Sequence, residues 1–192
     1  QTWQLQDSGV DCTLESVTFL DKHTGWAVGG RTEPYSHRAQ GVVLRTLDGG
    51  RRWTKMTGSM LPTLKSVKFF SPTRGWAVGS PSSLYGGGVF HTNDGGRSWS
   101  PVNAPSEHWL CADFFDESAG ALAGRDGKLS VVATKGAIKS RTPDLGLRAV
   151  RDLKLNPDGT GWLAGDGGLV MTTADGGLSW QLPARAIPAA AR

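Results

Sequence analysis

The fold is decided by residues 75–99, GWAVGSPSSLYGGGVFHTNDGGRSW, in which a small hydrophobic element leads to a glycine turn that a tryptophan closes. Both parts recur at residues 25–53 and 161–180. The third copy in chain order, residues 120–136, keeps the hydrophobic element but has lost the Asp and the Trp of the turn. Self-similarity of this kind indicates an architecture built from one supersecondary unit used several times.

The length of the repeat follows from the glycine that opens each hydrophobic element. Gly25 and Gly75 lie 50 residues apart, Gly75 and Gly120 lie 45 apart, and Gly120 and Gly161 lie 41 apart. One four-stranded propeller blade takes roughly 40–50 residues, and no helical periodicity runs between the glycines. The sequence therefore predicts an all-β propeller of four-stranded antiparallel blades, with the third one degenerate. In the second copy the expected strands are residues 63–70, 74–80, 87–93 and 97–103.

The turn that closes each intact repeat has a structural explanation. Asp-Gly-Gly favours a tight hairpin because glycine tolerates positive φ, and the Asp carboxylate can accept hydrogen bonds from its own turn. A Thr two positions earlier and a Trp three positions after the second glycine complete the pattern. Three copies at equivalent turns indicate a structural role, because a catalytic site is used once. The predicted structural residues are Thr46, Asp48, Gly50, Trp53, Thr92, Asp94, Gly96, Trp99, Thr173, Asp175, Gly177 and Trp180.

These three turns, at residues 46–53, 92–99 and 173–180, match the Asp-box, or BNR repeat. With the preceding Gly-Trp elements, the chain resembles the photosystem II assembly and stability factor family over about residues 2–182. The resemblance implies an exported, non-catalytic scaffold that binds protein and helps to assemble or stabilise a membrane complex. In a phototroph that complex would be a photosystem or reaction centre, and in another bacterium some other envelope complex.

Domain boundaries follow from the repeats. We expect blades at residues 14–57, 63–103, 109–142 and 147–182, and a tail or linker at 183–192. Residues 2–6, around Trp3, read like the last strand of a blade and form an orphan strand. The resembled family has larger rings, typically of seven blades, which need about 300 residues. The chain is therefore either part of a larger ring, which its length favours, or closes with four blades.

Composition narrows the classes of function. The 192 residues carry a net charge of +4 with scattered positive residues, which argues against a nucleic-acid tail or a polybasic membrane anchor. No stretch approaches the roughly 18 apolar residues of a membrane span. The chain begins at Gln1, so a removed export signal or trimming is expected. Together with the resemblance, this predicts a periplasmic, thylakoid-lumenal or extracellular location. The two cysteines, Cys12 and Cys111, are either bridged or, as we favour, two small buried residues.

We expect no catalytic residue, metal or cofactor. A sialidase would need a Tyr nucleophile served by a Glu, and the chain has only two tyrosines. Its four histidines show no spacing typical of metal ligands. A glycosidase that uses two carboxylates stays open, since Asp residues are available. The alternative to a protein-binding scaffold is therefore a secreted glycan-active propeller, either a glycosidase or a lectin.

The loops between the second and third strands carry the candidate binding residues. They are long in the first two copies, at residues 30–41 and 80–88, and both tyrosines lie there. Tyr and Arg are enriched in interface hot spots, and an Arg-bearing surface suits an acidic or C-terminal peptide. The alternative is a pair of tolerated surface insertions. Trp109 lies outside the repeat positions. It could cap the core of the third blade or lie on the same face as the two long loops, and we favour the core. The predicted partner-binding residues are Tyr35, His37, Arg38 and Tyr85.

Overall fold

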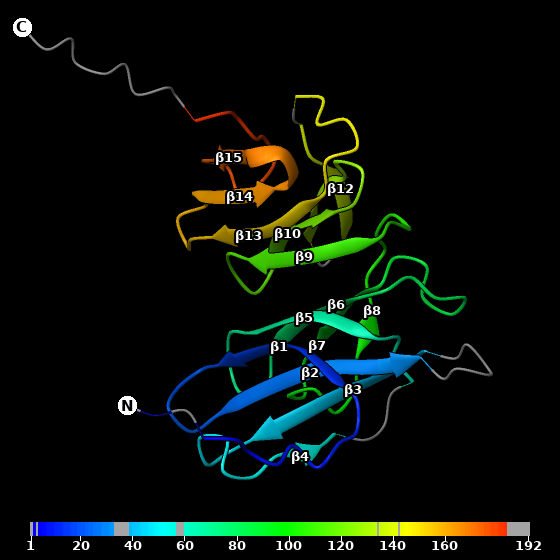
Figure 1. Cartoon of the computed structure of the whole chain (residues 1–192), viewed down its shortest axis with the longest axis vertical. Coiled ribbons are helices and arrows are strands. Elements are labelled where there is room, and N and C mark those ends of the chain that lie inside the picture. Colours follow the sequence, from blue (N-terminus) through cyan, green and yellow to red (C-terminus); the bar gives the residue numbers. More distant parts are fainter. Residues whose placement is uncertain are drawn as a thin grey trace, which may run out of the picture.

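The computed structural model describes residues 2, 4–32, 39–56, 60–133, 135–141 and 143–183. Four antiparallel sheets follow one another along the chain and stack along the longest axis of the molecule (Figure 1). Three sheets have four strands, and the fourth has three, extended by a bridge between Thr172 and Gln181. The predicted all-β architecture of four-stranded antiparallel blades is confirmed.

Each sheet is one blade, with its strands in sequence order. The first blade comprises β1 (Thr13–Phe19), β2 (Gly25–Thr32), β3 (Ala39–Thr46) and β4 (Thr54–Lys55). The second comprises β5 (Leu64–Phe69), β6 (Gly75–Gly79), β7 (Val89–Thr92) and β8 (Ser100–Pro101). The third comprises β9 (Trp109–Phe114), β10 (Ala119–Gly124), β11 (Leu129–Ala133) and β12 (Gly136–Lys139). The fourth comprises β13 (Val150–Leu155), β14 (Gly161–Gly165), a 3-10 turn η1 (Asp166–Gly168) and β15 (Leu169–Thr173).

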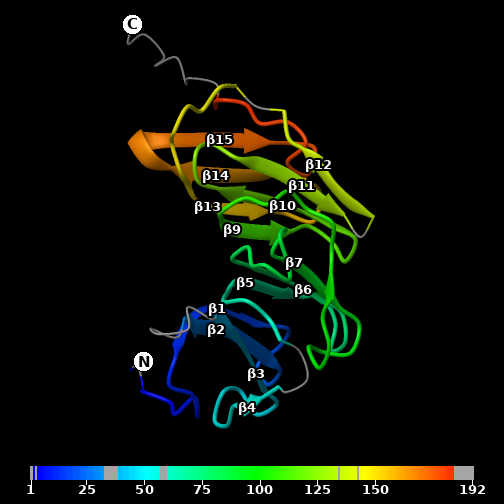
Figure 2. The same cartoon turned by 90° about the vertical axis from the view of Figure 1, so that its right-hand side faces the viewer.

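The blades form an open arc. The first strand of each blade contacts the first strand of the next, in the order β1, β5, β9 and β13. The first and fourth blades lie at opposite ends of the stack (Figures 1 and 2). The described part of the chain therefore does not close into a ring of four blades.

Each of the first three blades has a phenylalanine pressed against a glycine. Phe69 ends β5, and its ring covers Gly75 at the start of β6 so closely that a Cβ there would lie 2.7 Å from the ring. Phe19 covers Gly25 at the same 2.7 Å, and Phe114 covers Gly120. Any larger residue at these positions would push the ring away, which explains why the repeat opens with glycine.

Aromatic stacking joins consecutive blades. Trp26 of the first blade stacks on Phe69 of the second, with ring centroids 3.7 Å apart and planes 7° from parallel. Trp76 of the second blade stacks on Phe114 of the third at 4.9 Å and 18°. The core thus lies between the blades and not within each sheet. Such blades depend on their neighbours for burial, as in other repeat proteins.

The contact between the third and fourth blades uses a different pair. Ala121 stands where the first two blades have Trp, and Leu155 stands where the second and third have Phe. Both belong to one buried cluster, against which Phe115 also packs. A small residue facing an aliphatic one here replaces the large aromatic pair.

A buried carboxylate links the first strands of three consecutive blades. Asp113 in β9 accepts a hydrogen bond from Lys68 of β5 at 2.6 Å and lies 3.1 Å from Lys154 of β13. The backbone N–H of Leu155 donates to the same carboxylate at 2.9 Å. Burial alone would raise the pKa of Asp113, but these hydrogen bonds and charges outweigh it, so its pKa lies below the usual 3.8.

The Asp-box turns share one hydrogen-bond pattern. In the second blade, Thr92 Oγ1 donates to Asp94 at 2.9 Å and accepts from Gly96 N at 3.0 Å. Asp94 also accepts from the backbone and hydroxyl of Ser98, at 2.9 and 2.5 Å. The fourth blade repeats this arrangement at Asp175, and the first repeats it at Asp48 without the hydroxyl. These carboxylates are engaged within their own turns.

Two backbone hydrogen bonds also join the degenerate third blade to the fourth blade. Arg141, just beyond β12, donates its backbone N–H to Leu178 O at 2.7 Å. Trp180 donates its backbone N–H to Arg141 O at 3.0 Å. The chain leaving the third blade is thus paired with the Asp-box turn of the fourth.

The N-terminal segment differs from the expected orphan strand. Trp3 lies outside the described residues, and residues 4–6 form no strand. Farther along, Val10 and Cys12 pack against a buried cluster on the outer side of the first blade. Both cysteines are free and partly buried, and burial raises the pKa of the Cys111 thiol to about 12. The predicted tail beyond Pro183 also lies outside the described residues.

Replacing Asp94 with Ala removes an acceptor of three hydrogen bonds. We expect the free energy of unfolding to fall by about 1–2 kcal/mol in chemical denaturation. Asp48→Ala, at the turn without the hydroxyl contact, is the matched control and should cause a smaller loss. An unchanged stability for Asp94→Ala would contradict a structural role for the box.

Asp113→Asn should destabilise the protein in a pH-dependent way. Because the folded-state pKa is depressed, the ionised carboxylate stabilises the fold above about pH 4, and this stabilisation is lost as pH falls through the lower folded pKa. We expect a loss of about 1–3 kcal/mol at pH 7 that shrinks towards pH 3, measured by urea unfolding. Asp144→Asn, at an exposed position, should show little change at either pH.

Candidate binding site on the loop face

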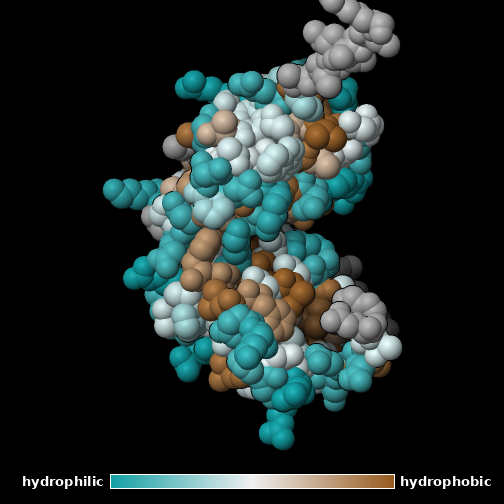
Figure 3. Space-filling model, turned by 90° about the vertical axis from the view of Figure 1, so that its left-hand side faces the viewer, coloured by the Kyte–Doolittle hydropathy of each residue, from teal (hydrophilic) through white to brown (hydrophobic). Residues whose placement is uncertain are grey.

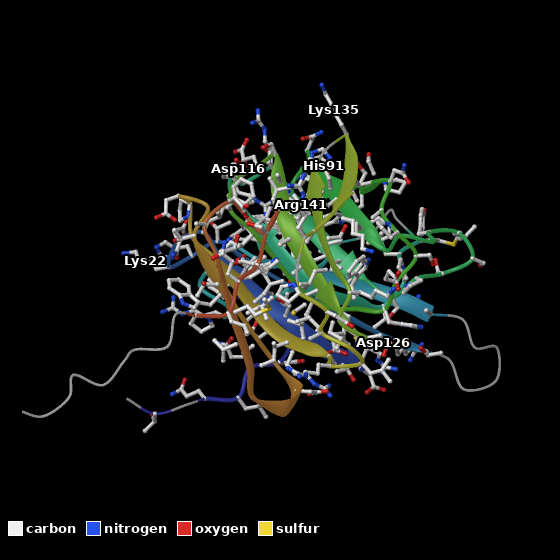
Figure 4. All side chains as sticks on the ribbon, turned by 90° about the horizontal axis from the view of Figure 1, so that it is seen from above. Lys22, His91, Asp116, Asp126, Lys135 and Arg141 are labelled. Carbon is white, nitrogen blue, oxygen red and sulfur yellow. The ribbon has the colours of Figure 1, made fainter. Side chains whose placement is uncertain are left out.

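The two faces of the arc are built from different connections. One face carries the Asp-box turns, and we call it the Asp-box face; there, the Gly95 N–H donates to Thr73 O at 2.8 Å, and the other two Asp-box turns make the equivalent contact. The opposite face carries the loops between the second and third strands of each blade, and we call it the loop face; there, Arg125 N donates to His108 O at 3.2 Å. Seen along the stack, Asp126 of the loop face lies on the opposite side from Asp116 and Lys135 (Figure 4).

The structure describes one of the four predicted partner-binding residues. Tyr35, His37 and Arg38 lie outside the described residues. Tyr85 lies on the loop between β6 and β7, half-buried, with its ring edge-on to Phe90 at 5.1 Å. It lines a shallow cavity of about 300 Å³ on the loop face. Tyr85 therefore has a packing role as well as access to this face.

A larger cavity, of about 390 Å³, opens farther along the loop face. Residues 105–109, which lead into β9, form one wall, the β10–β11 turn at 126–128 forms another, and residues 143–146 form the third. Pro105, Pro143 and Leu145 supply apolar surface. We call this the Trp109 cavity. The sequence did not predict this cavity, because its walls come from segments that carry no motif.

Two buried polar groups line the Trp109 cavity without a hydrogen-bond partner. Trp109 is 3% exposed and Ser140 is 8% exposed, and neither Trp109 Nε1 nor Ser140 Oγ has a partner among the described residues. Buried polar groups are nearly always paired, and an unpaired one costs about 1–3 kcal/mol. Both residues line the cavity, and their unpaired polar atoms are buried in its wall. Trp109 is in the core, as we favoured.

Charged side chains surround the cavity. Lys128 and Lys139 are exposed at its edge, and Lys128 lies 3.8 Å from Glu107. Asp126 and Asp144 lie on the same rim, and Asp144 accepts a hydrogen bond from Gly146 N. The edge thus presents both signs of charge around an apolar wall and two hydrogen-bonding groups, a combination that suits a peptide segment.

A glycosidase needs a carboxylic acid whose pKa is raised, whereas each carboxyl of the described residues with a shifted pKa is shifted downward. In most of these the turn itself supplies hydrogen bonds to the ionised form, as at Asp116 and Asp158. Within the described ranges, no cluster of three His, Cys, Asp or Glu side chains could hold a metal ion.

Repeated four-stranded blades, closed by Asp-box turns and stacked through their faces, define a β-propeller of Asp-box repeats. The chain belongs to the family described as "Photosynthesis system II assembly factor YCF48", whose model matches residues 1–108. The resemblance inferred from the motifs is thereby confirmed. The described residues include no helix long and apolar enough to cross a membrane.

Solved structures are similar to this chain at low sequence identity. The GH74 enzyme of Niastella koreensis matches with a TM-score of 0.58 and 15% identity, over 81% of this chain and 27% of that one. The chain thus spans about a quarter of the enzyme. The computationally designed protein Ika4 matches at 0.62 and 14%, over 92% of this chain and 100% of that one. A structure titled "YCF48 bound to D1 peptide" matches at 0.40 and 18%, over 88% and 80%. No curated protein gives a significant sequence match.

The unpaired indole of Trp109 leads to a stability prediction. Trp109→Phe removes an N–H without a partner, whereas Trp76→Phe removes one that donates to Glu117 O at 3.1 Å. We expect Trp76→Phe to lower the free energy of unfolding by about 1 kcal/mol more than Trp109→Phe. Equal losses in urea unfolding would indicate that the Trp109 N–H is satisfied in solution.

Proposed function

We propose that this chain is an exported, non-catalytic propeller scaffold that binds a protein segment and helps to assemble or stabilise a membrane complex. The family to which it belongs is described as an assembly factor. The observation that carries the proposal is the Trp109 cavity, with an unpaired N–H and hydroxyl at an apolar wall. The compartment would be the periplasm, the thylakoid lumen or the extracellular space.

The cavity suits one strand of an extended peptide. If the wall of the cavity opens on binding, a backbone carbonyl of the peptide would accept the N–H of Trp109, and Ser140 Oγ would donate to a second acceptor. Lys128 and Lys139 would attract a carboxylate, which favours an acidic segment or a chain terminus. The proposed mechanism is passive, because a rigid arc holds the segment without forming or breaking bonds.

The long loops of the first two blades extend the proposed surface. Tyr85 belongs to the shallow cavity of the same face. Tyr35, His37 and Arg38 stay predictions from the sequence, as additional contacts for a segment longer than the Trp109 cavity. An Arg beside a Tyr would add the planar, charge-assisted contacts that carboxylates favour.

A crosslinked pull-down from the solubilised envelope of the source organism tests the proposal. Wild-type protein should recover a membrane complex or one of its precursors, and Lys128→Glu/Lys139→Glu should lose it at least tenfold. The matched control is Lys22→Glu/Lys135→Glu, which makes the same charge change away from the Trp109 cavity (Figure 4). Equal recovery by both variants would exclude this cavity as the site. An empty bait that binds a polysaccharide column would instead support the glycan-active alternative.

A further inference from the structure

Another cavity, of about 480 Å³, opens on the Asp-box face at the junction of the first two blades. The first blade lines it with residues of β3, of its Asp-box turn and of β4, and the second blade adds Arg97 from its own Asp-box turn. These blades form the lower half of the molecule, where hydrophobic and hydrophilic side chains both reach the surface (Figure 3). We call this the arginine cavity. It is separate from the Trp109 cavity, which opens on the loop face.

The charge of the arginine cavity is strongly positive. Arg45, Arg52 and Arg97 line it, and Asp48 is the one carboxylate among its described lining residues. Three positive charges against one negative charge leave an excess of two. Asp48 is moreover engaged in its own turn, where it accepts hydrogen bonds from Thr46 Oγ1 and from the backbone N–H of Arg52, each at 2.9 Å.

Arg45 is held in a fixed place at the junction. Its guanidinium carbon lies 5.2 Å from the centre of the Trp26 ring, a cation–π contact. That ring is itself fixed, because it stacks on Phe69 and donates its N–H to Gly95 O at 2.9 Å. A Cβ on Gly95 would lie 3.4 Å from Arg45 Nη1, so the guanidinium also borders the turn of the second blade.

The charge of these arginines is not neutralised within the described part of the chain. Arg45 is partly exposed, and its Nε is buried in the wall without a hydrogen-bond partner among the described residues. Arg52 and Arg97 are exposed, and neither forms an ion pair with another described residue. A cation that is partly removed from water and lacks a carboxylate partner favours the approach of an anion.

An apolar surface lies beside the arginines. Leu47 is 65% exposed and lines the arginine cavity together with Met56 and Thr54. Ligand sites combine apolar walls with a few polar groups that fix the orientation of the ligand. The combination here suits an anion that carries an apolar group.

We propose that the arginine cavity binds a phosphate monoester that carries an apolar group. A phosphate monoester has a charge of about −1.5 to −2 at pH 7, which matches the excess of two positive charges, whereas a carboxylate or a sulfate ester has a single charge. Arg45, Arg52 and Arg97 would surround the phosphate, since guanidinium groups bind its oxygens in pairs. Leu47 would contact the apolar group. A soluble phosphate ester and the headgroup of phosphatidic acid share this chemistry.

Isothermal titration calorimetry with phenyl phosphate tests the proposal on the purified protein. Wild type should bind it saturably, and Arg52→Gln and Arg97→Gln should each weaken binding about tenfold, as loss of a hydrogen bond to a charged group does. Arg125→Gln is the matched control, because it removes the same charge from an exposed position on the loop face. It should leave binding unchanged, and melting curves would verify that each variant folds.

Related probes separate the two parts of the ligand. Phenyl sulfate, which has the same shape and less charge, and benzoate should each bind at least about tenfold more weakly than phenyl phosphate. Leu47→Ser should weaken binding of phenyl phosphate and leave binding of inorganic phosphate unchanged.

Vesicles distinguish the two sources of the phosphate. Arginine-dependent retention on phosphatidylcholine vesicles that contain phosphatidic acid would identify a lipid, and binding of phenyl phosphate without such retention would identify a soluble ester. No saturable binding of phenyl phosphate, an equal loss of binding in Arg125→Gln, or equal affinity for phenyl sulfate would overturn the proposal. Because the probes are small and the variants lie far from the Trp109 cavity, these outcomes leave the proposed protein-binding function unaffected.

Discussion

The close approach of a phenylalanine ring to a glycine is the contact on which the stacking of the blades depends. The glycine leaves no Cβ to hold the ring away, so Phe69 lies flat on Gly75 and exposes its other face to Trp26. Because Phe114 lies on Gly120 in the same way, the second and third blades each present a ring that a Trp of the preceding blade covers. Alanine at Gly75 would tilt the ring and weaken two blades at once.

The third blade shows how the repeat tolerates the loss of its usual parts. Its Trp is replaced by Ala121, its Asp-box is gone, and the next blade offers Leu155 in place of Phe. Ala121 and Leu155 belong to the same buried cluster, so the smaller residues replace the aromatic pair on both sides of one interface and that interface stays buried. Polar contacts add to this, since Asp113 joins the inner strands on both sides. An individual blade can therefore vary as long as its neighbour varies with it.

The sequence predicted the local features of the fold but few of the contacts between distant segments. The Gly-Trp elements and Asp-Gly-Gly turns determine strand order because each acts within a few residues, and the structure has them in the strands and turns expected. The Trp109 cavity was not predicted, because Trp109, Ser140 and Pro143 belong to three segments that only the fold brings together. The orphan strand predicted at residues 2–6 also differs from the structure, because residues 4–6 form no strand and, farther along, Val10 and Cys12 pack on the first blade.

The bridge from Arg141 to the last Asp-box turn affects how the molecule opens. In an array where each blade contacts only its neighbours, local unfolding starts where the links are weakest. The third and fourth blades are linked twice, through their inner strands and through the pairing of Arg141 with Leu178 and Trp180. Their amide hydrogens should therefore exchange with solvent as one cooperative unit.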